Sequence, residues 1–246
     1  MYSENITFST VNNQKLKGMI IFPNDRKEIY PAILFIHGWM SNMKGSIPRA
    51  EALAKLGYIS LLFDLRGHGE SDGTLGEVTA QGSLEDAIVA YDYLASLPKV
   101  EKEKISVIGS SYGGYTAALL VAKRPISSLV LRVPALYRNE TFDKPKVKEI
   151  RKTLRVYRQS EITAADNYAL KAISLYTNPL LLIESENDEL VPHQTIENYR
   201  KAINPETRLS DIVMPDVDHS LSKPKWRQDY IDILVRWFKN SQGMDK

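Results

Sequence analysis

The feature of this sequence that most constrains its fold is a series of short, continuous apolar runs that alternate with amphipathic segments. The runs 32–38 (AILFIHG) and 58–65 (YISLLFDL) are typical of strands that are buried on both faces of a sheet. Segment 81–97 instead carries Leu84 and Ile88 at helical spacing, continued by further apolar residues. This alternation predicts an α/β fold, with a mostly parallel eight-stranded sheet and helices on both of its faces. In chain order, the predicted strands are 5–11, 16–22, 32–38, 58–65, 105–109, 127–134, 179–188 and 209–215, and the predicted helices are 46–56, 81–97, 112–124, 192–203 and 225–240.

Composition excludes several classes of protein. With 246 residues, the chain is long enough for one α/β domain with a full core. A formal net charge of +2 gives no whole-protein field for nucleic acid, and the absence of cysteine excludes disulfides, thiolate metal sites and a cysteine nucleophile. With only four histidines, we expect no metal site. No apolar run approaches the length of about 18 residues that a membrane span needs, and no signal-peptide pattern opens the sequence, so we expect a cytoplasmic protein.

Polar residues gather at the ends of the predicted strands. His37, Asp64, Ser111, Asp188 and His219 each lie at or just beyond the end of a predicted strand. The carboxyl ends of parallel strands meet at one edge of the sheet, and α/β folds place their chemistry there. We therefore expect the functional site at this edge.

One connection is much longer than usual, because residues 135–178 separate two consecutive predicted strands. Within it, 145–159 (PKVKEIRKTLRVYRQ) predicts a helix whose apolar residues share one face: Val147, Ile150, Leu154 and Tyr157. Over 142–161 the chain has seven Lys and Arg against three Asp and Glu. We interpret 135–178 as a small helical cap inserted into a single domain that spans 1–246. The basic helix is interpreted as a solvated face, and attraction of carboxylate-bearing substrates is the alternative.

The stretch 105–116 (ISVIGSSYGGYT) contains two serines in a Gly-flanked turn between a predicted strand and a predicted helix. A sharp strand-to-helix turn strains its central residue and requires small residues two positions away on either side. Gly109 and Gly113 meet this requirement around Ser111, whereas Ser110 has large residues at both corresponding positions. The pattern therefore predicts Ser111 as a nucleophile, against the alternative of an ordinary Gly-containing turn.

A serine hydroxyl needs a base to accept its proton, and the base needs a third group to orient it. His219 follows a predicted strand in MPDVDHSLS and is the leading candidate for the base. The other histidines fit less well: His193 begins a predicted helix, His68 lies in a Gly-rich turn, and His37 lies where backbone donors are needed.

The orienting acid requires a fixed loop position from which its carboxylate can reach an imidazole. Asp188 ends the predicted strand PLLLIESEND and meets this requirement best. The rival carboxylates lie inside that strand or next to the candidate base: Glu184, Glu186, Asp216 and Asp218.

These residues and their order resemble the α/β-hydrolase family, and the resemblance covers essentially the whole chain. The order Ser111, Asp188, His219 is similar to that family's order of nucleophile, acid and base. FIHGW resembles its HG motif after the third strand, and FDLRGHGESDG resembles its loop after the fourth. The Ser-Tyr-Gly-Gly turn is similar to that of the prolyl-oligopeptidase-like branch, while HGWMSNMKG and the short cap resemble feruloyl-esterase and dienelactone-hydrolase-like esterases. Dienelactone hydrolases carry a cysteine nucleophile, and this chain departs from them in having none.

The resemblance implies an α/β-hydrolase fold and a serine esterase that acts on small to medium acyl groups without a cofactor or a metal. Ser111 would attack the carbonyl carbon, His219 would transfer the proton, and Asp188 would orient the imidazole. The family pattern assigns the oxyanion hole to the backbone N–H groups of Trp39 and Tyr112. Tyr112 has independent support, because it begins a predicted helix, whose unpaired N–H groups favour negative charge. The expected partner is a small-molecule ester, and a homo-oligomer is left open.

Two other functions remain as alternatives. A serine peptidase is favoured by the Ser-Tyr-Gly-Gly turn, although the chain has no room for the β-propeller of large oligopeptidases. A non-catalytic binding protein is disfavoured, because binding alone would not require all three catalytic residue types. The Gly-rich RGHGES loop fits neither a phosphate loop nor a dinucleotide fingerprint, and we interpret it as a rigid turn held by Arg66 and His68.

Overall fold

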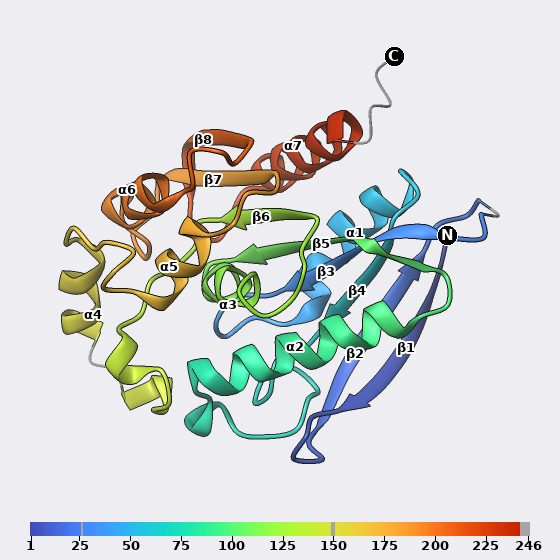
Figure 1. The fold of residues 1–246 in the computed structure, drawn as a ribbon, viewed down its shortest axis with the longest axis horizontal. Helices are drawn as coiled ribbons and strands as arrows, with labels where there is room; N and C mark the ends of the chain where they lie inside the picture. The colour runs from blue at the N-terminus through green and yellow to red at the C-terminus, as the bar shows by residue number, and fades with distance from the viewer. Residues whose placement is uncertain (26, 149–150, 242–246) are drawn as a thin grey trace.

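The computed structural model describes residues 1–25, 27–148 and 151–241. In this part of the chain, one eight-stranded sheet has the strand order β1-β2-β4-β3-β5-β6-β7-β8 (Figure 1). β1 pairs with β2 and β2 with β4 in antiparallel fashion, and all other neighbours are parallel. The strands are β1 (Tyr2–Ser9), β2 (Lys15–Phe22), β3 (Tyr30–Ile36), β4 (Ile59–Phe63), β5 (Val100–Ser110), β6 (Ser128–Arg132), β7 (Leu180–Asn187) and β8 (Leu209–Asp218).

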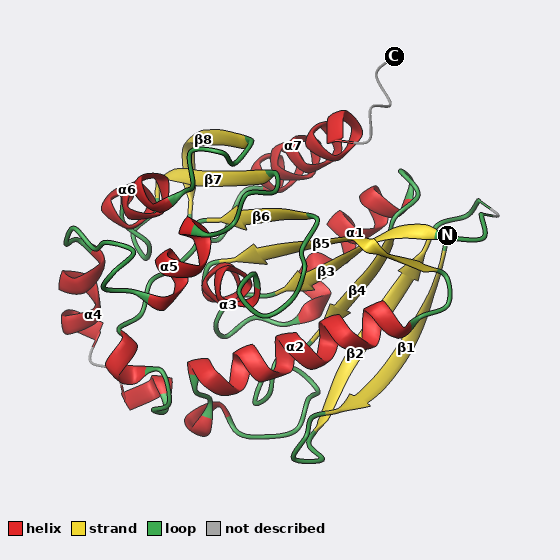
Figure 2. Ribbon diagram, viewed as in Figure 1, coloured by secondary structure: helices red, strands yellow, loops and turns green. Residues whose placement is uncertain are grey.

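Helices pack on both faces of the sheet, as Figure 2 shows. The apolar layer on one face contains side chains of α2, α3, α5 and α6, and the layer on the other face contains those of α1 and α7. The helices are α1 (Ile47–Ala54), α2 (Ala80–Ser96), α3 (Tyr112–Leu120), α4 (Arg151–Arg158), α5 (Tyr168–Ser174), α6 (His193–Ala202) and α7 (Pro224–Ser241). The predicted α/β-hydrolase fold is therefore confirmed, with a mostly parallel sheet between two helical layers.

The physical causes of these elements are visible at single residues. All five residues of β4, four of them apolar and one a serine, are buried, as expected for a strand between two other strands of a covered sheet. α2 begins after Thr79, whose side chain accepts a hydrogen bond from the backbone N–H of Gly82 and so caps the helix. Its residues Leu84 and Tyr91 are buried against the sheet. Burial of this one helical face explains the spacing of the apolar residues in the sequence.

The helix predicted over 145–159 is wrong in part. The described residues form a short 3-10 helix (Lys146–Lys148) and α4 (Arg151–Arg158), while Ile150 lies outside the described residues. The sequence also gave no prediction of α5, which has seven residues and is too short to show a helical period. Its one local signal is Asn167, whose side chain accepts hydrogen bonds from the first backbone N–H groups of the helix and so caps it.

Buried polar side chains hold the connection from β6 to β7 together and attach it to the loop that follows β7. Arg158 donates from Nε to the carbonyl of Leu136 at 3.1 Å and from Nη1 to the carbonyl of Leu190 at 3.0 Å. Asn167 donates from Nδ2 to the carbonyl of Tyr137 at 2.8 Å. These bonds join α4 and the start of α5 to the loops that follow β6 and β7.

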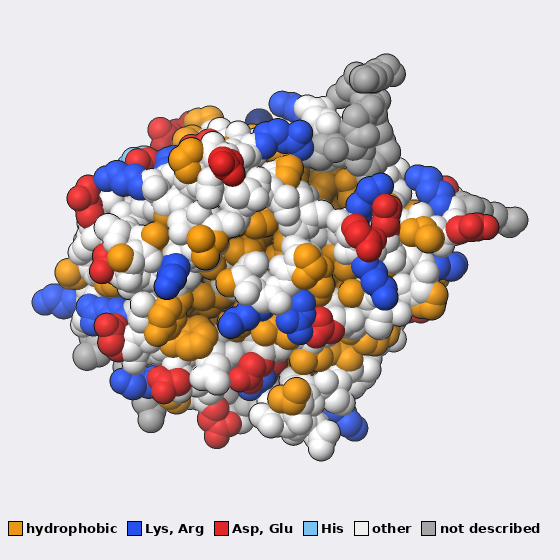
Figure 3. All heavy atoms as spheres, in the orientation of Figure 1, with side chains coloured by type: hydrophobic (Ala, Val, Ile, Leu, Met, Phe, Trp, Pro, Cys, Tyr) orange, Lys and Arg blue, Asp and Glu red, His pale blue; other side chains and the backbone are white. Residues whose placement is uncertain are grey.

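The described surface is mixed in charge. On the face shown in Figure 3, basic and acidic side chains are interspersed around a central group of apolar side chains. None of the helices in the described ranges combines the length and the apolar composition that spanning a bilayer requires.

Candidate active site

The turn between β5 and α3 holds Ser111 in a conformation that few residues other than glycine adopt. Its φ is 55° and its ψ is −116°. Three backbone hydrogen bonds fix this conformation. The Ser111 N–H donates to the carbonyl of Arg132 at 2.9 Å, and the Ser111 carbonyl accepts from the N–H groups of Tyr115 at 3.1 Å and Ala135 at 3.0 Å. The strained turn is therefore held by both α3 and the strand next to β5.

The glycines on either side of Ser111 allow the backbones to approach closely. A Cβ added at Gly109 would lie 2.3 Å from the carbonyl oxygen of Gly113. A Cβ added at Gly113 would lie 2.1 Å from the carbonyl oxygen of Ile36, at the end of β3. Both distances are far inside van der Waals contact, in agreement with the requirement inferred from the sequence pattern.

The structure brings Ser111, Asp188 and His219 into one hydrogen-bonded chain at the carboxyl edge of the sheet. His219 follows β8, and its Nε2 lies 3.0 Å from Ser111 Oγ. Asp188 follows β7, and its Oδ2 lies 2.6 Å from His219 Nδ1. The other carboxylate oxygen accepts from the backbone N–H groups of Leu190 at 2.8 Å and Val191 at 2.7 Å, which fixes the carboxylate plane. The arrangement favours the tautomer in which Nδ1 carries the proton and Nε2 can accept one from the hydroxyl.

The rival groups have other partners. His193 lies on α6 with 68% of its side chain exposed, and its Nδ1 lies 2.5 Å from Glu184 Oε1. Asp218 accepts from the backbone N–H and the hydroxyl of Ser222. In the described residues, the ring of His219 bonds to the carboxylate of Asp188 and to none of the four rival carboxylates.

Arg132 supports the loop that carries His219, a role that the sequence analysis missed. It is the last residue of β6 and is 5% exposed. Its Nη2 donates to the carbonyl of His219 at 2.8 Å, to the carbonyl of Asp218 at 3.3 Å and to Ser185 Oγ at 3.0 Å. Burial lowers the pKa of this guanidinium to about 10, so it remains charged at neutral pH. The available signal was a charged residue at the end of an otherwise apolar strand.

Trp39 and Tyr112, the residues predicted to supply the oxyanion hole, belong to two segments that meet at Ser111. A Cβ added at Gly38 would lie 4.0 Å from Ser111 Oγ, so the loop after β3 passes next to this hydroxyl. Tyr112 is the first residue of α3, where N–H groups have no acceptor within the helix. Neither N–H donates to an acceptor in the described part of the chain. Both are thus available for an oxygen atom that develops negative charge near Ser111.

His37 fixes the peptide that carries the Trp39 N–H. Its Nε2 accepts from the Leu65 N–H at 3.0 Å, so its Nδ1 carries the proton and donates to the Gly38 carbonyl at 2.8 Å. The Gly38 carbonyl and the Trp39 N–H belong to one planar peptide and point in opposite directions. Holding the carbonyl therefore also sets the direction of the N–H. Both ring nitrogens of His37, a rival base in the sequence analysis, are therefore occupied by bonds to the backbone.

Acid is expected to destabilise the fold through His37. Burial lowers the pKa of His37 from 6.5 to about 4. Between these values the unfolded chain binds a proton that the folded protein does not, so stability falls as the pH decreases through this window, by up to about 3 kcal/mol. Urea unfolding at pH 7 and pH 4.5 measures the loss, and His37→Asn is expected to lose less stability than the wild type over this interval. His193→Asn, at an exposed ring, is the control; equal losses for the wild type and His37→Asn would contradict the prediction.

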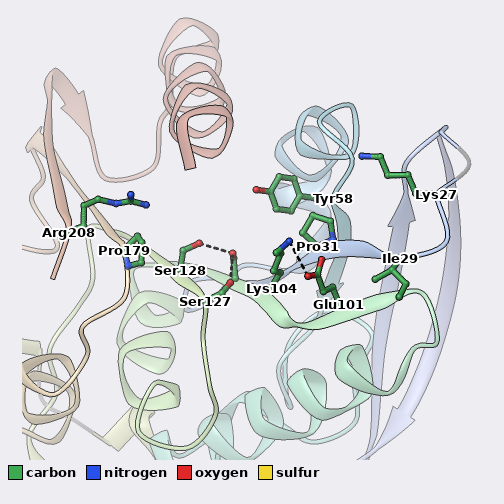
Figure 4. Close-up of a pocket in the computed structure, with 11 residues that line it drawn as sticks. Lys27, Ile29, Pro31, Tyr58, Glu101, Lys104, Ser127, Ser128, Pro179 and Arg208 are labelled. Atoms are coloured by element: carbon green, nitrogen blue, oxygen red, sulfur yellow. Dashed lines mark hydrogen bonds and ion pairs between the residues drawn. The ribbon is translucent and has the colours of Figure 1, made fainter. Parts of the chain in front are cut away.

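A pocket of about 510 Å³ lies at the opposite edge of the sheet, where the parallel strands begin (Figure 4). Ser106 and Ser128 line it, and their hydroxyls lie 2.7 Å apart. No imidazole is among the described residues that line this pocket, so its hydroxyls have no base beside them.

Metal ligands could come from any part of the described structure. No described group of three or more His, Cys, Asp and Glu residues could hold a metal ion. Within the described ranges, Ser111 is the serine whose hydroxyl is joined to both an imidazole and a carboxylate.

Comparisons with known proteins agree with this fold. The sequence model of the prolyl oligopeptidase family matches residues 46–245. An uncharacterized protein of Mycobacterium tuberculosis is 28% identical over 87% of this chain and 72% of its own length. The mitochondrial palmitoyl-protein thioesterase ABHD10 of Mus musculus is 33% identical over 41% of this chain and 33% of its own length. The solved structure of Est1E from Butyrivibrio proteoclasticus with ferulic acid bound has a TM-score of 0.76 at 19% identity, covering 96% of this chain and 98% of that one.

Proposed function

This chain belongs to the prolyl oligopeptidase family and is an α/β hydrolase, and we propose that it is a serine esterase that cleaves carboxylic esters of small to medium acyl groups. The observation that carries the proposal is the hydrogen-bonded chain from the Ser111 hydroxyl through His219 to Asp188, with distances of 3.0 Å and 2.6 Å. A hydroxyl, an imidazole and a carboxylate in this order can perform acyl transfer without any further group. The connection between β6 and β7 acts as a cap beside this site.

The mechanism proceeds through an acyl-enzyme. Ser111 Oγ attacks the carbonyl carbon while His219 Nε2 accepts its proton. The N–H groups of Trp39 and Tyr112 donate to the resulting oxyanion. His219 then protonates the leaving oxygen as its bond to carbon breaks, and a water molecule repeats the sequence to release the acid. Asp188 stabilises the imidazolium in both steps, and each oxyanion donor contributes about 2.7–4 kcal/mol to lowering the barrier.

Thioesters and peptides are the competing substrates. The thioester alternative is supported by the partial similarity to a palmitoyl-protein thioesterase, and the peptide alternative by the family's name. Both share the acyl-enzyme chemistry and differ in the leaving group. An amine leaving group must be protonated before it departs, which makes amides the more demanding substrates for the same three residues.

A substrate panel tests the proposal. The panel contains p-nitrophenyl esters from acetate to octanoate, the corresponding acyl thioesters, and aminoacyl p-nitroanilides, with kcat/KM measured for each. We expect the highest kcat/KM for an ester of a short or medium acyl group. A higher kcat/KM for anilides would establish a peptidase instead, and a higher kcat/KM for thioesters a thioesterase. Absence of labelling by a fluorophosphonate would contradict a serine hydrolase altogether.

Arg132→Met is expected to lower kcat about 10- to 100-fold with little change in KM, because a displaced base loses alignment with the hydroxyl. The substitution removes the donors that hold the carbonyls of Asp218 and His219. The pH dependence of kcat/KM should shift as well, since the imidazole is no longer held in one geometry. Arg49→Met is the control: the guanidinium groups of Arg132 and Arg49 both lie over the Tyr230 ring, at 5.6 Å and 5.3 Å from its centroid, but Arg49 donates to Gly45 and Ser46. Equal kcat values for the Arg132 and Arg49 variants would show that Arg132 does not position the base.

A further inference from the structure

The side chain of Lys146 lies among three aromatic rings. Its Nζ is 4.2 Å from the ring centroid of Trp39, 4.5 Å from that of Tyr137 and 5.4 Å from that of Tyr112. We call these three rings the aromatic box. They pack edge to face, with the Trp39 and Tyr112 centroids 5.3 Å apart and those of Tyr112 and Tyr137 5.5 Å apart. Cation–π attraction thus holds the ammonium at a defined place.

The aromatic box borders the candidate active site through its backbone. Tyr112 directly follows Ser111, and Trp39 directly follows Gly38, whose added Cβ would lie 4.0 Å from Ser111 Oγ. The two residues that offer N–H groups to the oxyanion therefore also supply two walls of the box. Trp39 and Tyr112 are therefore the structural link between the Lys146 ammonium and the Ser111 hydroxyl.

The charge of Lys146 is not neutralised by a neighbouring acid. Within the described residues, no carboxylate lies within ion-pair distance of its ammonium, whereas Lys44 pairs with Glu70 at 2.9 Å and Lys201 with Glu161 at 2.8 Å. Lys146 is also half-buried, while those two lysines are exposed. Aromatic faces attract a cation without neutralising its charge, so the N–H groups of the Lys146 ammonium can still donate hydrogen bonds to an anion.

The backbone also fixes the position of Lys146. Its N–H donates to the carbonyl of Val78 at 2.8 Å, and the carbonyl of Phe142 accepts from the N–H of Gln81 at 2.9 Å. Both bonds attach this part of the connection to the start of α2. The ammonium is therefore held from the backbone side and from the ring side.

We propose that Lys146 binds a carboxylate on the acyl part of the substrate, which makes half-esters of dicarboxylic acids the preferred substrates. This inference rests on the proposed esterase function and specifies its substrate class. The ester carbonyl lies at Ser111, with its oxygen toward the Trp39 and Tyr112 N–H groups, and the far carboxylate accepts hydrogen bonds from the ammonium. A cationic acyl group is disfavoured, because it would have to displace Lys146 from the aromatic box.

The test compares esters that differ in one charge. The p-nitrophenyl half-esters of succinate, glutarate and adipate are paired with the neutral p-nitrophenyl esters of butyrate, valerate and hexanoate, which have acyl chains of similar length. In the wild type, at least one half-ester should have a higher kcat/KM than its neutral partner. Lys146→Met keeps an apolar side chain against the rings and should lower that kcat/KM about 10- to 100-fold, the usual value of a hydrogen bond to a charged group. The neutral esters should change less than about twofold, which lies within the effect of an ordinary surface substitution.

Lys144→Met is the matched control, because Lys144 is exposed, lies two residues away and carries the same charge. It should leave both substrate series unchanged, and Lys146→Arg should retain part of the preference for half-esters. Equal losses in the Lys144 and Lys146 variants would show a general field effect and would overturn the proposal. Unchanged half-ester turnover in Lys146→Met would overturn it as well. If neutral esters are hydrolysed in either case, the esterase function stands and only the assignment of Lys146 fails.

Discussion

Ser111→Ala is expected to lower kcat/KM for the best ester by about 10³- to 10⁶-fold while leaving the protein folded. The substitution removes the atom that attacks the carbonyl carbon, and no other described hydroxyl bonds to His219. The oxyanion donors and the base remain, so a small residual rate is expected. Alanine carries the same Cβ as serine and can occupy the strained turn at φ 55° at a similar cost.

Ser110→Ala provides the control for this prediction, since Ser110 is the adjacent hydroxyl and has no hydrogen-bonded base among the described residues. Its kcat/KM and its labelling by a fluorophosphonate should match the wild type, whereas Ser111→Ala should not be labelled. Circular dichroism and the urea midpoint establish that both variants are folded. Retained turnover in folded Ser111→Ala would exclude this residue as the nucleophile.

Gly113→Ala is expected to destabilise the fold by about 3 kcal/mol or more, at the upper end of the range for single substitutions. The added Cβ would lie 2.1 Å from the carbonyl oxygen of Ile36 and 2.5 Å from that of His37. Both are backbone atoms, so no side-chain rotation can relieve the overlap. β3 must separate from the turn between β5 and α3, and the peptide that aims the Trp39 N–H moves with it. We therefore expect activity to fall together with stability.

Urea unfolding of a glycine-to-alanine series measures this effect. Gly76→Ala is the control, because no atom lies within 4 Å of the added Cβ, and its stability should differ little from that of the wild type. Gly114→Ala should be intermediate, since its added Cβ lies 3.0 Å from Pro134 Cα. Equal unfolding midpoints for the variants at Gly113 and Gly76 would contradict the packing described here.

The fold could be predicted from the sequence because local pattern and burial agree along most of the chain. The run 58–65 has only one polar residue, Ser60, before Asp64, and such a run is typical of a strand that is buried on both faces in the middle of a covered sheet. The prediction of a helix over 145–159 was wrong in part: α4 (Arg151–Arg158) lies within it, but Lys146–Lys148 form a 3-10 helix. Lys146 donates its backbone N–H to the carbonyl of Val78, just before α2, and its ammonium lies over aromatic rings; such contacts leave no period in the sequence.

The residues of the candidate site also differ in how strongly the local sequence marks them. Ser111 is marked by its own neighbours, because a strained turn needs glycine on both sides. Arg132 and Lys146 have no such local mark. Arg132 is significant only because residues 218 and 219 fold back onto it, and Lys146 only because three rings from distant segments surround it. The sequence pattern identified the three residues that the structure joins by hydrogen bonds, Ser111, His219 and Asp188, but it gave no indication of Arg132 and raised Lys146 only as part of a basic segment.

The way the long connection between β6 and β7 is attached has a consequence for engineering. Arg158 and Asn167 anchor it through buried side-chain bonds, and Lys146 is attached separately, through its backbone N–H to the carbonyl of Val78. A library that varies positions 144–147 while keeping both anchors would sample new acyl preferences on an unchanged reactive serine. Substrate preference could then be changed by substitutions in this segment alone, and the catalytic rate could be optimised separately at other positions.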